Sequence, residues 1–236
     1  MRIHRSERDG LTMADKTFRT FDDVTPDDLI GGGGRLSNQR VPPDLGEIPG
    51  LVNPADDAHV DGFRREVAGR PLIVEVGPGK GAFLVGLADR RKEALCVGFE
   101  SRLTFCRNTL SRARKAERSN VRVVWGDARV TIPLLVEPGT AHEAYLLFPD
   151  PWWKKKHSRR RHGPLMAGVL VNALAPGGLM VLKSDVARYL EILKDVFIET
   201  GAFEPCDLPG GLPLTNREVK IIENNENVFA AAVTKK

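Results

Sequence analysis

Cysteine is scarce in this sequence, and long apolar runs are missing. Cysteine occurs only at Cys96, Cys106 and Cys206 among 236 residues, and no two of these stand in C-x-x-C spacing. An odd number without that spacing argues against a disulfide framework and a thiolate zinc site, and it fits a reducing compartment. Nothing approaches the roughly 18 consecutive apolar residues of a membrane span, and the amino end lacks the apolar core of a secretory signal. The sequence therefore predicts a cytoplasmic protein without a membrane segment.

A strong excess of one charge is also absent. The formal net charge is +4, with an isoelectric point near 9.0, which permits a polyanionic partner without requiring one. No metal-ligating constellation is visible, because His157 and His162 lie in a cationic run that would repel a metal ion. With 42% hydrophobic and 28% charged residues, the composition is that of a folded soluble protein.

Two regions differ in character. Residues 1–60 are rich in Asp, Arg, Gly and Pro, include the run Gly31–Gly34, and carry almost no periodic apolar pattern. We interpret them as a flexible amino-terminal extension, and residues 61–236 as the folded domain.

Short apolar runs alternate with helical patterns through the domain. Strands are expected at 72–76, 95–100, 121–125, 144–148, 179–182 and 228–233, and helices at 81–88, 101–118, 164–174 and 186–197. Asp185 is expected to cap the last of these helices. Such alternation implies βαβ units and a mostly parallel sheet. The predicted fold class is a doubly wound α/β domain with helices on both faces of the sheet.

Four acids stand at or just beyond successive strand ends, at Glu75, Glu100, Asp127 and Asp150. Any one of them alone could be a helix cap. Ligands of doubly wound sheets bind at the carboxyl ends of the strands, so one acid per strand across four units favours a shared ligand.

A glycine turn follows the first acid and indicates which ligand that is. Gly77, Gly79 and Gly81 are spaced by two and two, whereas the dinucleotide fingerprint spaces its glycines by two and three. An acid in the turn suits the cationic amino group of adenosylmethionine better than a pyrophosphate. Glu100 is placed for ribose hydroxyls and Asp127 for the exocyclic amine of adenine. The pattern favours adenosylmethionine over NAD.

The segment from Phe148 to Arg161 combines an acid, two tryptophans and a basic run. Prolines flank Asp150 and restrict its backbone, which suits an acid that must meet a reacting atom. Six of the eight residues from Lys154 to Arg161 are Lys or Arg. Cations beside aromatic rings are typical of RNA-binding surfaces, although a charge run is also common on a plain solvated face.

These motifs resemble the bacterial tRNA (guanine-N7-)-methyltransferases, in which Phe-Pro-Asp-Pro-Trp is followed by Lys, His and Arg. The resemblance covers the chain from about Pro71 onward. It implies a class I methyltransferase with a seven-stranded Rossmann-like sheet and an antiparallel last strand, S-adenosylmethionine as cofactor, and tRNA as substrate, methylated at the variable-loop guanine. By the same carry-over, Asp150 is catalytic; cofactor contacts come from Glu75, Gly77, Gly79, Gly81, Glu100, Asp127 and Asp150; and substrate contacts come from Lys154, Asp185, Thr215, Asn216, Arg217 and Glu218.

One departure is visible, and some alternatives stay open. The family pattern has an aromatic residue where this chain has Arg217, and Thr215 with Glu218 also reads as a helix capping box. A methyltransferase for another RNA or a small molecule, a non-catalytic RNA-binding relative and an NAD-dependent oxidoreductase remain as rivals. Either a monomer or a homodimer is compatible with the sequence.

Overall fold

The computed structural model describes residues 48–149 and 162–236, with backbone only for residues 162–165. The described strands are β1 (Leu51–Val52), β2 (Leu72–Val76), β3 (Leu95–Glu100), β4 (Val121–Trp125), β5 (Ala141–Leu147), β6 (Leu174–Ser184), β7 (Phe203–Cys206) and β8 (Phe229–Lys235). The described helices are α2 (Asp57–Val67), α3 (Ala82–Arg90), α4 (Leu103–Lys115), α5 (Ala128–Leu135), α6 (His162–Ala173), α7 (Ala187–Glu199) and α8 (Asn216–Glu223).

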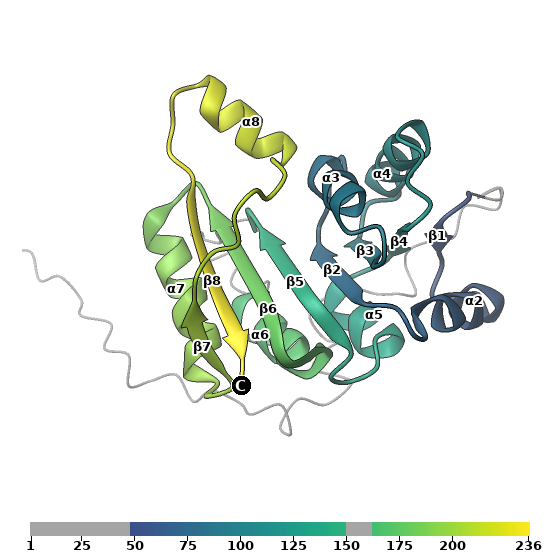
Figure 1. The fold of residues 1–236 in the computed structure, drawn as a ribbon, viewed down its shortest axis with the longest axis horizontal. Helices are drawn as coiled ribbons and strands as arrows, with labels where there is room; N and C mark the ends of the chain where they lie inside the picture. The colour runs from purple at the N-terminus through teal and green to yellow at the C-terminus, as the bar shows by residue number, and fades with distance from the viewer. Residues whose placement is uncertain (1–47, 150–161) are drawn as a thin grey trace, which may run out of the picture.

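All of these strands form one sheet in the order β1-β4-β3-β2-β5-β6-β8-β7 (Figure 1). The strands from β1 to β6 pair in parallel, whereas β8 pairs antiparallel with both β6 and β7. The predicted doubly wound, mostly parallel sheet with an antiparallel last strand is confirmed. The described part holds eight strands instead of seven, because the two-residue β1 adds to β4 at one margin.

Two apolar layers sandwich the sheet, which confirms helices on both faces. Phe63, Ile132, Leu170 and Phe197 lie in one layer, from α2, α5, α6 and α7. The helices α3 and α4 cover the opposite face, where Phe83 is fully buried against Tyr145 of β5. Each layer removes strand side chains from water, and the hydrophobic effect stabilises the sheet between them.

The amino-terminal boundary differs from the expected one. Both β1 and the first residues of α2 fall within the range that we assigned to the flexible extension. Asp56 begins α2 by accepting the backbone N–H groups of Ala58 and His59. Ordered structure therefore begins before residue 60, while residues 1–47 lie outside the described residues.

The helix expected at residues 164–174 ends at Ala173, and the Pro176-Gly177-Gly178 segment follows it. That segment lies inside β6, which begins at Leu174 opposite Ala141 of β5. The register between these strands shifts after Ala141, and this irregularity absorbs the proline and the glycines.

None of the helices in residues 48–149 and 162–236 is long and apolar enough to cross a membrane.

Candidate functional site

The strand order brings together the strands that carry the predicted acids. The neighbours β4, β3, β2 and β5 lie side by side, with Asp127 after β4, Glu100 at the end of β3 and Glu75 near the end of β2. Asp150 follows β5 in the sequence but lies outside the described residues, as does Lys154. Chain order reverses between β2 and β5, and such a switch point is where open α/β sheets bind ligands.

Glu75 is a buried carboxylate with one oxygen atom left unpaired by the described residues. It is 2% exposed, and its Oε2 atom has no hydrogen-bond partner within the described part of the chain. Burial, and secondly the charge of Glu100 on the neighbouring strand, raise the pKa of Glu75 from 4.5 to about 8. An orphaned buried carboxylate costs free energy, so its presence at the switch point fits a cationic group of a ligand.

The glycine turn after Glu75 adopts a backbone that side chains disfavour. Gly77, Gly79 and Gly81 have φ angles of 70°, 56° and 73°, in the left-handed region that glycine tolerates. A Cβ atom at Gly77 or Gly79 would meet nothing within 4 Å, whereas one at Gly81 would lie 2.6 Å from Thr109. Gly77 and Gly79 thus leave open backbone for a ligand, and Gly81 admits the close packing of α4.

Glu100 is held by the residues that follow it. Its Oε1 atom accepts the backbone N–H of Arg102 at 2.8 Å and lies 3.8 Å from the Arg102 guanidinium. The carboxylate is 5% exposed and ends β3 beside Trp125 of β4. Held in place at the strand end, this carboxylate can accept hydrogen bonds from hydroxyl groups.

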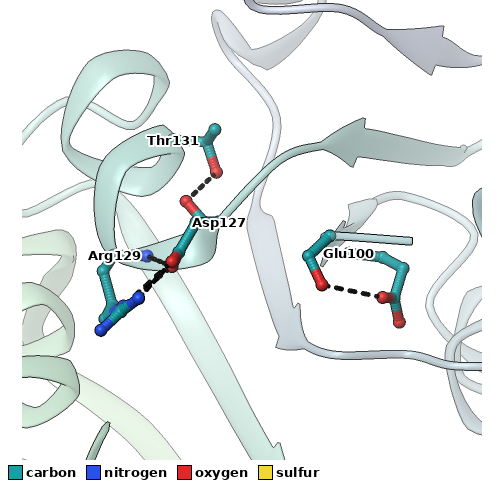
Figure 2. A network of polar contacts seen from close by, with 5 residues as sticks. Glu100, Asp127, Arg129 and Thr131 are labelled. Atoms are coloured by element: carbon teal, nitrogen blue, oxygen red, sulfur yellow. Dashed lines mark hydrogen bonds and ion pairs between the residues drawn. The ribbon is translucent and has the colours of Figure 1, made fainter. Parts of the chain in front are cut away.

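Asp127 has a partner that sequence reasoning missed. Its side chain caps α5 by accepting the backbone N–H of Arg129 at 3.0 Å, and both carboxylate oxygens also accept from the Arg129 guanidinium (Figure 2). Arg129 is buried, and the ion pair raises its pKa. Thr131 donates to the Asp127 carbonyl oxygen at 3.0 Å. The predicted acid is therefore oriented from both its main chain and its side chain.

A third buried glutamate, Glu218, lies on the β6 side of the same edge and pairs through both of its carboxylate oxygens. Glu218 Oε1 accepts from Lys183 Nζ at 2.6 Å, and both side chains are almost inaccessible, at 5% and 7%. Its Oε2 accepts the backbone N–H of Thr215, while Thr215 Oγ1 accepts the N–H of Glu218. The capping box predicted for this segment is confirmed. Glu218 thereby ties α8 to the end of β6 (Figure 1).

Asp185 does not cap the helix that follows it, so that expectation is wrong. Val186 occupies the N-cap position of α7, and its N–H donates to Ser184 Oγ at 3.0 Å. Asp185 instead accepts from Arg217 at 2.5 Å. This pair is a second link between β6 and α8, and it lies at the surface, with Arg217 52% exposed.

Lys183 also contacts the strand that leads to Asp150. Its carbonyl oxygen accepts the N–H of Phe148 at 2.8 Å. Phe148 has a φ angle of 52°, unusual for a side chain of this size, and its ring centroid lies 5.8 Å from the Arg217 guanidinium carbon. Sequence reasoning missed Lys183, because a single lysine at the end of an apolar strand carries no motif.

Rossmann-like topology, an acid on each of three neighbouring strands and an open glycine turn define the class of protein: a class I methyltransferase. Solved structures agree on the fold. The 16S rRNA methyltransferase KamB matches with a TM-score of 0.54 at 16% identity, over 77% of this chain and 94% of that one. The aminoglycoside-resistance methyltransferase NpmB1 matches with a TM-score of 0.53 at 14% identity, over 75% and 93%.

Sequence comparison defines the family. The family model described as "Putative methyltransferase" matches residues 69–231. A tRNA (guanine-N(7)-)-methyltransferase of Myxococcus xanthus is 37% identical over 174 residues, which is 70% of this chain and 84% of that protein. One from Cutibacterium acnes is 36% identical over 138 residues, 58% of this chain and 50% of that protein. The chain belongs to the tRNA (guanine-N7)-methyltransferase family.

Proposed function

We propose that this chain transfers the methyl group of S-adenosylmethionine to nitrogen-7 of a guanine in tRNA, the variable-loop guanine that the family resemblance implies. The observation that carries the proposal is the unpartnered, buried carboxylate of Glu75 beside the open backbone of Gly77 and Gly79. The ionised form of Glu75 would repel a pyrophosphate, whereas the cationic amino group of adenosylmethionine favours that ionised form and compensates it. The choice of guanine nitrogen-7 in tRNA as the methyl acceptor is supported by the names of the related enzymes.

The described acids suit three parts of the cofactor. Glu75 would hold the amino group, Glu100 the ribose hydroxyls and Asp127 the exocyclic amine of adenine. When bound, the sulfonium supplies an electrophilic methyl group. Arg129 holds Asp127 in one orientation, and Thr109 donates to the Gly79 carbonyl at 3.0 Å, which fixes the glycine turn. Such preorganisation lowers the entropic cost of positioning a methyl donor.

Asp150 takes the catalytic role in this proposal. Nitrogen-7 of guanine has an in-plane lone pair and no proton, so its attack on the methyl group requires no strong base. Positive charge moves onto the purine during transfer, and a carboxylate near the base stabilises it. The flanking Pro149 and Pro151 restrict the acid, and Lys154 with the basic run would contact tRNA phosphates.

The function is tested by incubating the protein with methyl-labelled adenosylmethionine and bulk tRNA, then digesting the tRNA to nucleosides. Label in 7-methylguanosine is the expected result. Label in another nucleoside would make the chain an RNA methyltransferase of different specificity. Adenosylmethionine binding with no label in RNA would favour a small-molecule substrate or a non-catalytic role, and binding of NADH instead would favour the oxidoreductase.

The role of Asp150 is tested by Asp150→Asn, with the exposed Asp207→Asn as a control of equal charge change. We expect kcat to fall about a hundredfold or more, the scale seen when one preorganised electrostatic group is lost, while tRNA affinity changes little. Single-turnover kinetics and tRNA titrations separate the two quantities. An unchanged kcat would remove Asp150 from the mechanism.

A further inference from the structure

A hollow of about 620 Å³ lies between the glycine turn and α4, and its walls are cationic. Lys80 comes from the turn, and Arg112 and Lys115 come from the last two turns of the helix. Asn108 and Ser111 add an amide and a hydroxyl group. No acidic residue is among the described residues that line it. We call this feature the α4 hollow.

Helix electrostatics account for only part of this charge. Cations in the last turn of a helix interact favourably with its carboxyl-terminal dipole, and Arg112, Arg114 and Lys115 lie in that turn of α4. Lys80 belongs to a different element, however, and faces the same hollow. Three full positive charges also outweigh the roughly half negative charge of the helix end. The hollow therefore favours anions.

The hollow is joined to the proposed cofactor turn by two hydrogen bonds. Thr109 Oγ1 donates to the carbonyl of Gly79, and Arg112 Nε donates to the carbonyl of Lys80, both at 3.0 Å. Because these acceptors are consecutive in the turn, α4 and the turn are held in one arrangement. An anion in the hollow would lie at a fixed position relative to the methyl donor.

The hollow on the other flank of α4 has a different charge balance. This second hollow, of about 670 Å³, lies against β1 and α2. Two of its arginines are paired, Arg118 with Asp89 and Arg122 with Glu66, each at 2.6 Å. Glu66 also lines that second hollow, beside Arg107 and Arg114, whereas the described lining of the α4 hollow combines three cations with no acid.

We propose that the α4 hollow binds the phosphate backbone of the tRNA substrate and fixes its position relative to the target guanine. This inference rests on the proposed function. The hollow is open, and its cations lie at the surface, so each contact to a small anion would be weak. A polyanion gains from several such contacts at once, through the release of its counterions. Phosphodiesters of an RNA chain therefore fit better than a single free anion.

The test is the full-length Lys80→Gln/Lys115→Gln variant, with Arg112 left intact because it supports the turn. The Lys92→Gln/Lys194→Gln variant is the matched control, since it loses the same charge at the amino end of β3 and on α7. Binding of tRNA is titrated by fluorescence anisotropy across KCl concentrations without methyl transfer. Steady-state methylation and adenosylmethionine affinity are measured alongside.

We expect the slope of log affinity against log salt to fall by about one per lysine removed. The KM for tRNA should rise about tenfold, with kcat and adenosylmethionine affinity within about twofold of wild type. Lys80→Arg/Lys115→Arg should restore wild-type behaviour, because charge is what the backbone recognises. A salt slope and a KM equal to those of the control variant would overturn the inference, as would a loss confined to adenosylmethionine affinity.

These outcomes are distinct from failure of the proposed function. If wild type forms 7-methylguanosine while the double variant behaves like the control, the α4 hollow is passive and the function stands. If wild type forms none, yet the double variant alone loses tRNA affinity and salt dependence, the backbone site stands and the proposed reaction falls.

Discussion

Two glutamates at the carboxyl edge of the sheet are almost equally buried and have opposite surroundings. Glu75 on β2 is 2% exposed and has an orphaned oxygen within the described residues, whereas Glu218 on α8 is 4% exposed and pairs with Lys183. A buried charge costs several kcal/mol unless it is paired. The chain compensates Glu218 itself, whereas it supplies no such cation to Glu75 within the described residues. Under the proposed function, the amino group of the cofactor compensates Glu75, and Glu218 holds a helix.

Removing Lys183, the cation that pairs with Glu218, should have the largest effect on the free energy of unfolding. Lys183→Met leaves Glu218 buried without its partner, and we expect a loss of about 3–5 kcal/mol in the free energy of unfolding. Urea unfolding measures it. Lys183→Met/Glu218→Gln keeps an acceptor for the Thr215 N–H and removes the charge, so most of the loss should be recovered. A double variant as unstable as the single one would show that the ion pair is not the cause.

The unpaired carboxyl group of Glu75 should make the free energy of unfolding depend on pH. The pKa of Glu75 is about 8 in the fold and 4.5 in an exposed chain, so the folded state binds the extra proton between these values. Without ligand, stability should then fall as pH rises from about 4.5 to 8, by about 1 kcal/mol per pH unit. Glu75→Gln should lack this component, as urea unfolding at several pH values will show. Parallel pH profiles for the two proteins would contradict the assignment.

Glu75 should also lose a proton when adenosylmethionine binds, whereas the paired Glu218 should not. Glu75 must ionise to compensate the amino group, so adenosylmethionine binding near pH 7 should release up to about one proton from it. Calorimetry in buffers of different ionisation enthalpy measures that release. Glu75→Gln should bind more weakly, by about tenfold, and release correspondingly fewer protons. Equal proton release by both proteins would place the cofactor's cation elsewhere.

The ion pair between Arg217 of α8 and Asp185 should contribute least to the free energy of unfolding. Arg217 and Asp185 lie at the surface, and such pairs contribute about 0–1 kcal/mol. Arg217→Ala should therefore change the free energy of unfolding by less than about 1 kcal/mol, in contrast to Lys183→Met. A loss comparable to that of Lys183→Met would mean that the surface pair, not the buried one, holds α8.

Strong local patterns made most of the fold predictable. Apolar, β-branched runs such as Leu72–Val76 and Val121–Trp125 coincide with strands as predicted. The helix α5 was missed because it spans only eight residues and contains Pro133. The strand β7 was missed because it is four residues long and includes Pro205. Local sequence indicates an element well when its residue types agree with that element throughout, and a proline inside it removes that agreement.

The acids of the candidate site were predictable from the sequence, but the ion pairs around them were not. Strand-end positions predicted Glu75, Glu100 and Asp127, since each acid is close to its strand in the sequence. The pairs that hold α8 depend on the fold, because Lys183 and Glu218 are 35 residues apart and Asp185 and Arg217 are 32 apart. No periodicity connects such distant residues, so the structure was needed to pair them.

The margins of the sheet limit how this protein can associate. At one margin β1 has two residues, and at the other β7 has four, including Pro205, which has no N–H to donate. In the described part of the chain, few free backbone groups are therefore available at these margins for a strand from another chain. Contacts with another chain at these two margins would have to rely on side chains.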